Sequence, residues 1–187
     1  MPKVILYIAT SQDGFIADKH GDVDWLNELN LCESTATSGA SSSADNEDLG
    51  YSALIERISI ILMGSRSYKQ VLTFGEWPYV GKDSYIFTSQ PLTSTRPDIF
   101  FVSDDVRTFL EKINNKVEKD IWLMGGAELI KSFAKEKLID ECIITIIPKI
   151  LGEGIKLELP YDDFIMTQST SKNNIVQQFF LRKQSLL

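Results

Sequence analysis

The chain has 187 residues, of which 43% are hydrophobic and 24% charged, a composition typical of one globular domain with a sizeable core. Its net charge of −7 argues against binding to the phosphate surface of a nucleic acid or a membrane, because no dense basic patch is available. The longest apolar stretch, around residues 142–147, is far shorter than the roughly 20 residues that a membrane-spanning helix needs.

Six apolar runs predict the strands of a sheet. They cover residues 4–9, 58–63, 84–88, 99–102, 121–124 and 142–147. The first run follows the N-terminus without a signal-peptide cleavage pattern, so we expect a cytoplasmic protein. Helix-length segments separate most of the runs, which is typical of an α/β sheet covered on both faces.

Two of the intervening segments carry the apolar stripe of an amphipathic helix. In residues 104–117 the stripe consists of Val106, Phe109, Leu110, Ile113 and Val117. In residues 127–138 it consists of Leu129, Ile130, Phe133, Ala134 and Leu138. Ser103 with Asp104 and Asp105 is expected to cap the first helix and to supply acids to its first turn.

The end of the chain changes character. Residues 164–170 and 174–183 alternate without helical periodicity, and a turn-like sequence at 170–173 joins them, which predicts an antiparallel hairpin that closes the sheet. Residues 33–46 contain almost no large apolar side chain and cannot offset their ordering entropy by burial. We therefore predict a single domain over residues 1–187 with a mobile loop at 33–46.

Two segments each combine an apolar run, a glycine and the start of a helix, at Gly64 and at Gly125–Gly126. Such a junction exposes backbone N–H groups and the positive end of a helix dipole, where a phosphate can bind. Each glycine taken alone is also typical of a tight turn. Two such junctions in one small domain favour a nucleotide clamp.

The sequence offers little for metal or thiol chemistry. Cys32 and Cys142 have no metal or redox spacing and are expected to be free thiols. His20, the single histidine, lies in a turn-like segment and is typical of a solvated surface residue. We therefore expect no metal site, and a zinc hydrolase or deaminase is nearly excluded.

The order of several motifs resembles that of the dihydrofolate reductase superfamily. The motifs occupy residues 8–17, 62–64, 87–89, 124–126 and 148–154. Residues 11–17 with 22–25, and residues 74–79, are similar to the branch that contains the reductase domain of riboflavin biosynthesis. The resemblance implies a three-layer α/β fold with a mostly parallel sheet and a homodimer. It also implies NADPH, with NADH as an alternative, across the carboxyl ends of the central strands.

The cofactor contacts follow from the resemblance position by position. Ala9 and Ile16 match backbone contacts to the nicotinamide carboxamide, and Thr88 with Ser89 matches the strand end beside the adenosine. The positions that match phosphate-binding turns and helix starts are Gly64, Ser65, Arg66, Ser67, Gly125, Gly126, Ala127, Glu128 and Leu129. The glycine pair is joined by a cis peptide bond in the family. Most relatives have Arg directly after the first glycine, whereas this chain has Ser65 and then Arg66.

The resemblance also points to a catalytic carboxylate in the helix before strand 58–63. Asp48 falls at that place, with Ser52 on the same helical face, as a substrate anchor or proton relay. An acid that merely caps the helix start is an equally good interpretation, and Asp45 or Glu47 are alternatives under a shifted alignment. Trp25 and Thr145 are further candidates for the substrate pocket, although Trp25 is equally suited to packing the helix start.

These observations predict a reductase that transfers hydride to a small heteroaromatic substrate, pterin-like or pyrimidine-like, or to a carbonyl. One alternative is the pyrimidine-ribose reductase of riboflavin synthesis, although Met124 stands where those reductases carry Glu. Dihydrofolate reductases have a Pro-Trp-containing loop that leads directly into the carboxylate helix, whereas here residues 33–46 separate Trp25 from Asp48, which disfavours strict folate reduction. A second alternative is a nucleotide-binding protein without catalysis.

Overall fold

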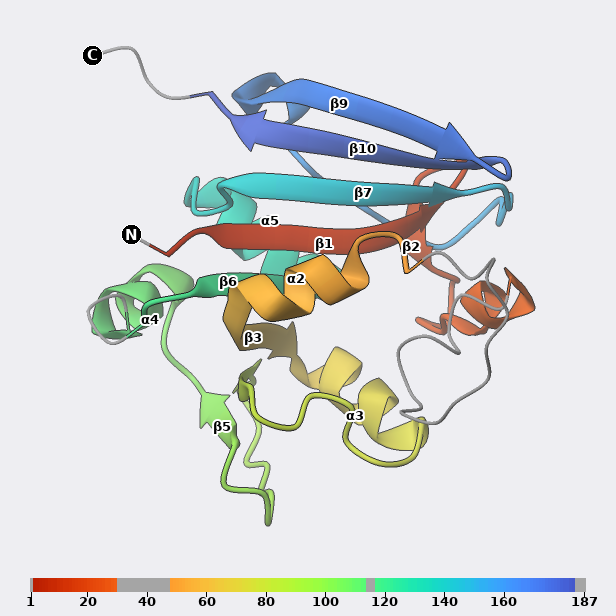
Figure 1. The fold of residues 1–187 in the computed structure, drawn as a ribbon. Coiled ribbons are helices and arrows are strands. Elements are labelled where there is room, and N and C mark those ends of the chain that lie inside the picture. Colours follow the sequence, from red (N-terminus) through yellow and green to blue (C-terminus); the bar gives the residue numbers. More distant parts are fainter. Residues whose placement is uncertain (1, 30–47, 114–116, 184–187) are drawn as a thin grey trace.

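The computed structural model describes residues 2–29, 48–113 and 117–183 (Figure 1). Within them, eight strands form one sheet in the order β5-β4-β3-β6-β1-β7-β10-β9. Their bounds are β1 Val4–Ser11, β3 Ile58–Gly64, β4 Asp83–Phe87, β5 Ile99–Val102, β6 Asp120–Gly125, β7 Glu141–Ile147, β9 Phe164–Lys172 and β10 Ile175–Arg182. A separate two-stranded sheet pairs β2, Phe15–Ala17, with β8, Ile155–Lys156.

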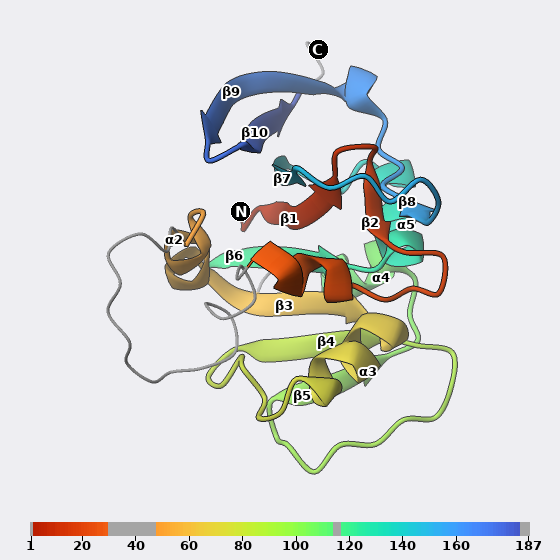
Figure 2. The ribbon, with the colours of Figure 1, turned by 90° about the vertical axis from the view of Figure 1, so that its right-hand side faces the viewer.

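Most strand pairs of the large sheet are parallel. Strand β1 pairs in parallel with β6 and β7, β3 with β4 and β6, and β4 with β5. Strand β10 runs antiparallel to both β7 and β9, and this hairpin forms one end of the sheet (Figure 2). The predicted mostly parallel sheet with an antiparallel C-terminal hairpin is confirmed.

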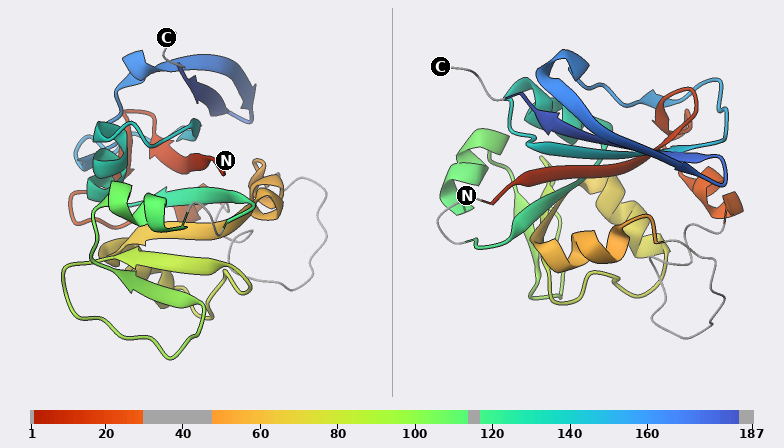
Figure 3. Two further views of the ribbon diagram at one scale, coloured as in Figure 1. Left: turned by 90° about the vertical axis from the view of Figure 1, so that its left-hand side faces the viewer. Right: turned by 45° about the horizontal axis from the view of Figure 1, so that its top comes forward.

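Helices cover both faces of the sheet. Their bounds are α2 Tyr51–Arg57, α3 Ser65–Thr73, α4 Val106–Ile113 and α5 Ala127–Lys135, with short 3₁₀ helices η1 Asp24–Leu29 and η3 Tyr161–Asp163. Helices α4 and α5 pack on one face, and α2 and α3 pack on the other (Figure 3). None of the helices in the described residues has the length and hydropathy to cross a bilayer.

Strand β3 shows why the sheet needs both layers. Ile60 and Leu62 are buried in the core that contains α4 and α5, whereas Ile61 and Met63 are buried in the core that contains α2 and α3. Successive side chains of a strand point to opposite faces, so an unbroken apolar run supplies both cores. Burying each such side chain stabilises the fold by roughly 1.5–3 kcal/mol.

Several boundaries differ from the sequence predictions. Helix α4 is shorter than predicted, and its cap is Asp105, which accepts hydrogen bonds from the Thr108 N–H at 3.0 Å and the Thr108 hydroxyl at 2.7 Å. Helix α5 ends at Lys135, and Lys137 takes a left-handed conformation with φ of 57°. The loop predicted at 33–46 and the thiol of Cys32 lie outside the described residues.

The hairpin turn also differs from its prediction. Strands β9 and β10 are joined by Asn173 and Asn174, with φ of 51° and 63°, rather than by a turn at 170–173. Positive φ at both central residues fits a two-residue hairpin turn whose twist matches the strands, and asparagine tolerates this conformation.

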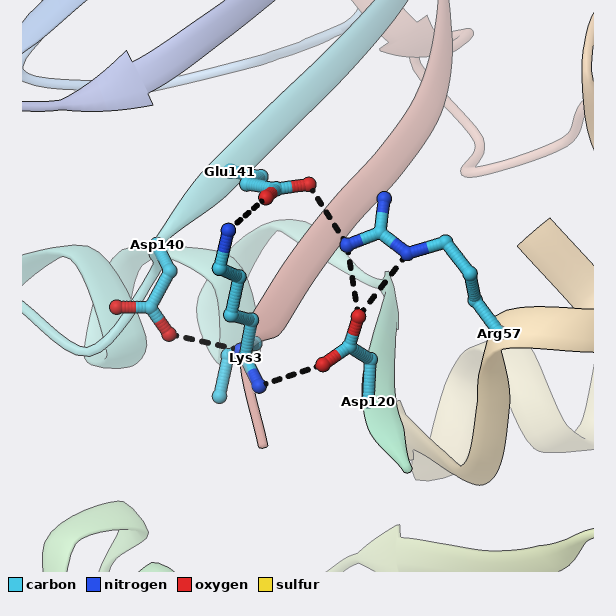
Figure 4. A network of polar contacts seen from close by, with 6 residues as sticks. Lys3, Arg57, Asp120, Asp140 and Glu141 are labelled. Carbon is cyan, nitrogen blue, oxygen red and sulfur yellow. Dashed lines mark hydrogen bonds and ion pairs between the residues drawn. The ribbon is translucent and has the colours of Figure 1, made fainter. Parts of the chain in front are cut away.

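A polar network ties the amino ends of β1, β6 and β7 to the end of α2 (Figure 4). Arg57 donates from Nη2 to Asp120 at 2.7 Å and to Glu141 at 3.0 Å. Lys3 donates from Nζ to Glu141 at 2.6 Å and from its backbone N–H to Asp120 at 2.9 Å. Beside it, burial raises the pKa of Asp140, which accepts a backbone hydrogen bond from β1. The network therefore stabilises the end of the sheet at which these parallel strands begin.

We expect Arg57→Gln to lower the free energy of unfolding by about 1 kcal/mol, because Asp120 and Glu141 keep only Lys3 as a partner. Lys131→Gln is the control, since its pair with Glu158 is 58% and 65% exposed, so solvent screens it and its loss should leave stability unchanged. Urea denaturation of the two variants measures the difference. Equal stability of the two variants would contradict a structural role for the network.

Candidate functional site

The carboxyl ends of the parallel strands open onto a cleft of about 1960 Å³. Ala9 of β1, Gly64 of β3 and Gly125 of β6 all line it. Ligands of open α/β sheets bind at this edge, where the strand order reverses. Because ordinary small-ligand pockets measure roughly 300–1,000 Å³, the cleft can hold a large cofactor together with a second ligand.

The two predicted glycine junctions meet at the centre of the cleft. Met63 pairs with Gly125 across β3 and β6, and a Cβ atom on Gly64 would lie 3.6 Å from the nitrogen of Gly126. The Gly125–Gly126 peptide bond is cis, as the resemblance implied. Helix α3 begins directly after Gly64 and α5 directly after Gly126, and neither cap residue makes a side-chain hydrogen bond. The positive ends of two nine-residue helices therefore converge on one space.

Every position that the resemblance assigned to the cofactor lines this cleft. These positions are Ala9, Ile16, Gly64, Ser65, Arg66, Ser67, Thr88, Ser89, Gly125, Gly126, Ala127, Glu128 and Leu129. The pairing of Gly64 with Phe87 sets the segments that follow β3 and β4 side by side. The structure thus brings together four segments that are far apart in the sequence.

The α3 side of the cleft carries positive charge. Arg66 and Lys69 lie three residues apart on α3, are exposed and line the cleft. No carboxylate in the described part of the chain forms an ion pair with either side chain. Lys69 had no motif to mark it in the sequence. The two cations are therefore available to an anionic ligand.

The α2 side of the cleft is an aromatic wall made of Tyr7, Tyr51, Tyr79 and Trp122, with Met124 beside it. The Trp122 ring packs edge-on against the other three, with centroids 6.0, 6.0 and 5.6 Å away. Such contacts fix the wall, since edge-to-face aromatic pairs stabilise beyond their burial. No sequence pattern predicted this wall, because its members come from four separate segments.

Two phenols of the aromatic wall stay protonated at neutral pH. Burial, with the negative charge of Asp48, raises the pKa of Tyr7, and burial raises that of Tyr51. The Tyr7 hydroxyl donates to the carbonyl oxygen of Leu49 at 3.1 Å. A protonated Tyr51 hydroxyl on the cleft surface is a hydrogen-bond donor for a ligand.

Asp48 lies before α2 rather than within it, and it does not line the main cleft. Its carboxylate accepts hydrogen bonds from the backbone N–H groups of Gly50 at 2.9 Å and Ser52 at 3.0 Å. Hydrogen bonds from Ser52 and Gly50 lower the pKa of Asp48, so the carboxylate is ionised. It borders a second cavity of about 290 Å³ together with Gln177. This geometry is that of a helix-capping acid.

The other substrate candidates are also outside the lining of the main cleft. Ser52 is exposed on α2, Trp25 is buried in η1, and Thr145 is buried in β7. The Thr145 hydroxyl accepts a hydrogen bond from Gln177 Nε2 at 3.0 Å. None of these three residues lines the main cleft, although Thr145 pairs with Ala9 across β7 and β1.

Metal and thiol chemistry find no support in the described residues. No three of their His, Cys, Asp and Glu side chains are grouped closely enough to hold a metal ion. Burial raises the pKa of the Cys142 thiol to about 12, which makes it unreactive. His20 lines the margin of the cleft but is exposed in a turn.

Comparison with known proteins identifies relatives of the chain. The family model of the RibD C-terminal domain matches residues 2–163. The uncharacterised protein YwjB of Bacillus subtilis is 36% identical over 83% of this chain and 82% of its own length. The uncharacterised protein YyaP of the same organism is 30% identical over 81% of this chain and 78% of its own length.

Solved structures share the fold. A protein of Shewanella sp. PV-4, provisionally assigned to riboflavin biosynthesis, is 30% identical, with a TM-score of 0.79 over 97% of this chain and 99% of its own. A bifunctional pyrimidine deaminase and reductase of Thermotoga maritima is 16% identical, with a TM-score of 0.66 over 97% of this chain and 57% of its own. Enterococcus faecalis dihydrofolate reductase, complexed with NADP(H), is 14% identical, with a TM-score of 0.65 over 97% of both chains. The predicted dihydrofolate-reductase-like fold is confirmed.

We expect Asp48→Ala to lower the free energy of unfolding by about 1 kcal/mol and Asp48→Asn to change it by less than about 0.5 kcal/mol, because asparagine still accepts at a helix start. Chemical denaturation of both variants measures the two effects. If Asp48→Ala were as stable as the unmodified protein, the capping contacts would not contribute to stability.

Proposed function

Since the chain belongs to the RibD C-terminal domain family, we propose that it is an NADPH-dependent reductase acting on a small heteroaromatic or carbonyl substrate. The observation that carries this proposal is the convergence of every expected cofactor position on one cleft. When bound, NADPH would supply the hydride, and the protein would supply orientation and an environment without water.

The phosphate part of the cofactor fits the meeting point of the two glycine junctions. A Cβ atom on Gly126 would lie 3.4 Å from the Ser67 hydroxyl, so a side chain there would occupy the space between the starts of α3 and α5. The uncapped first turns of both helices offer N–H groups to an anion. We propose that Gly64, Ser65, Ser67 and the segment that opens α5 hold the pyrophosphate.

The substrate ring is proposed to lie against the aromatic wall, next to the nicotinamide end near Ala9 and Ile16. Trp122 is 5% and Tyr79 is 8% exposed, so the wall is already dehydrated and would exclude water from the reacting face. The protonated Tyr51 hydroxyl would donate a hydrogen bond to a carbonyl oxygen or a ring nitrogen. Asp48 would act on the substrate by placing the start of α2, and hence Tyr51.

NADPH is preferred over NADH in this proposal because of Arg66 and Lys69. A 2′-phosphate carries the charge that distinguishes the two cofactors, and an arginine pairs with phosphate by two parallel hydrogen bonds. The neighbouring Thr88 and Ser89 would contact the adenosine side. The shift of the arginine by one position relative to most relatives keeps it on the lining of the cleft.

The reductase step of riboflavin synthesis remains the second candidate, because the Shewanella relative is assigned to that process. Met124 stands beside the aromatic wall at the place where those reductases carry Glu, which favours a different substrate. A non-catalytic nucleotide-binding protein would show cofactor binding without turnover on any pterin or pyrimidine.

We further propose a cytoplasmic homodimer. Strand β9 forms one edge of the large sheet, and all of its residues after Phe164 are exposed. Ile165 and Met166 on this strand are 55% and 53% exposed, which is unusual for large apolar side chains at a sheet edge. Light scattering of the purified protein measures the mass that tests this proposal.

We expect the protein to bind NADPH saturably, and Gly126→Ala to weaken this binding by about tenfold or more, because the added methyl group would take space that we propose for the pyrophosphate. The φ of −81° at Gly126 is open to alanine, so the variant should fold normally. Energy transfer from tryptophan to reduced nicotinamide measures the affinity, and thermal unfolding is the control. Failure of the unmodified protein to bind either dinucleotide would contradict the reductase proposal.

We expect Arg66→Gln to weaken NADPH binding by about tenfold and to leave NADH binding unchanged, because only NADPH carries the 2′-phosphate. Lys131→Gln is a matched control, since Lys131 is exposed on α5 and lies outside the cleft lining. Competition titrations with both dinucleotides measure the ratio. A parallel loss for NADH would show that Arg66 does not read the 2′-phosphate.

A further inference from the structure

We propose that Asp13 is a positioning residue that braces the loop between β1 and β2 and so places Ile16 against the nicotinamide end of the cleft. The proposal rests on the proposed function, because it assigns the brace to a nicotinamide cofactor. Asp13 lies within the motif at residues 11–17, but the resemblance assigned it no role. The evidence is a set of contacts between two loops that lie at the carboxyl ends of β1 and β7.

Three donors converge on the Asp13 carboxylate. The Ser11 hydroxyl donates to Oδ1 at 2.7 Å, the Leu151 N–H donates to Oδ1 at 3.2 Å, and the Gly152 N–H donates to Oδ2 at 2.8 Å. The hydrogen bond from Ser11, with those from Gly152 and Leu151, lowers the pKa of Asp13 to about 2. The carboxylate is therefore ionised, and both of its oxygens join the β1–β2 loop to the loop after β7.

Ser11 extends this contact into the backbone of the β1–β2 loop. Its hydroxyl oxygen accepts a hydrogen bond from the Phe15 N–H at 2.9 Å while the hydroxyl donates to Asp13. Ser11 is 1% exposed, so water cannot replace the interaction. The start of β2 is thus held through Ser11 by the carboxylate of Asp13.

Backbone contacts reinforce the same junction. The Gln12 N–H donates to the Lys149 carbonyl at 2.8 Å, and the Leu157 N–H donates to the Gly14 carbonyl at 3.1 Å. Strand β2 then pairs with β8. A Cβ atom on Gly154 would overlap the carbonyl oxygen of Ala17, so the two backbones are in direct contact.

The braced segments form part of the cleft. Ile16 and Ala17 of β2 line it, and so does Ile155 of β8. Asp13 itself does not line the cleft, so it reaches the cofactor only through these residues. Holding such a loop in its binding conformation before the ligand arrives lowers the ordering cost of binding. The affinity that Asp13 supplies should therefore depend on the nicotinamide end of the ligand.

The test compares NADPH with 2′-phosphoadenosine diphosphoribose, which lacks the nicotinamide. Asp13→Asn keeps the size of the side chain but replaces one accepting oxygen with a donor that faces another donor. We expect it to weaken NADPH binding by about tenfold and binding of the fragment by less than about twofold. Asp98→Asn is the matched control, since Asp98 pairs with Arg96 at 2.9 and 2.7 Å and lies outside the cleft lining.

A double-mutant cycle with Ser11→Ala separates positioning from general damage. Since Ser11 and Asp13 act through one contact, the loss of NADPH affinity in the double variant should be clearly smaller than the product of the two single losses. Equal losses for NADPH and the fragment, or independent effects of the two changes, would overturn the proposal. If Asp13→Asn binds NADPH as tightly as the unmodified protein, the brace is refuted while the reductase proposal stands. If the unmodified protein binds no NADPH, that result contradicts the proposed function itself, on which the role of Asp13 rests.

Discussion

The parallel register of β3 against β6 is the constraint on which the rest of the cleft depends. It sets Met63 opposite Gly125, so β3 and β6 end at the same level of the sheet. Helix α3 then begins on one face of the sheet and α5 on the other. The two turns are in close contact, since a Cβ atom on Gly64 would lie 3.6 Å from the Gly126 nitrogen. Once the turns touch, the positive ends of α3 and α5 point at a common space.

The cleft has a different chemistry in two of its parts. Near α2, Trp122 and its aromatic neighbours belong to one core and present a mostly apolar surface. Around the starts of α3 and α5 the lining is charged, with Arg66 and Lys69 on α3 and Glu128 on α5. A ligand that extends from one side to the other meets a polar environment at one end and an apolar one at the other. Such a division suits a cofactor with a phosphorylated half and a reacting ring.

Sequence reasoning succeeded where the signal was local. The strand, glycine and helix pattern at Gly64 and at Gly125 is contained in a few residues, and it predicted both junctions.

The predicted helices are longer than the observed ones, because Val117 and Leu138 pack on the core without being helical. The strands β2 and β8 are too short to show an alternating pattern. The position of Asp48 at a helix start was equally compatible with capping and catalysis. Its hydrogen bonds from Gly50 and Ser52 show the capping contacts, and the catalytic role stays a prediction. The aromatic wall depends on topology, so no spacing predicted it.

The central place of β1 constrains how the chain is built during synthesis. Strand β1 precedes the other strands in the chain, but its neighbours in the sheet are β6 and β7, which begin at Asp120 and Glu141. The segment that becomes the middle of the sheet therefore remains without its partners until synthesis has passed Asp120 and Glu141. Pairings between such distant residues form slowly, and an unpaired apolar strand is exposed to aggregation in the meantime. Truncated or stalled chains of this protein should consequently depend on chaperones more than a fold whose first strand pairs with its second.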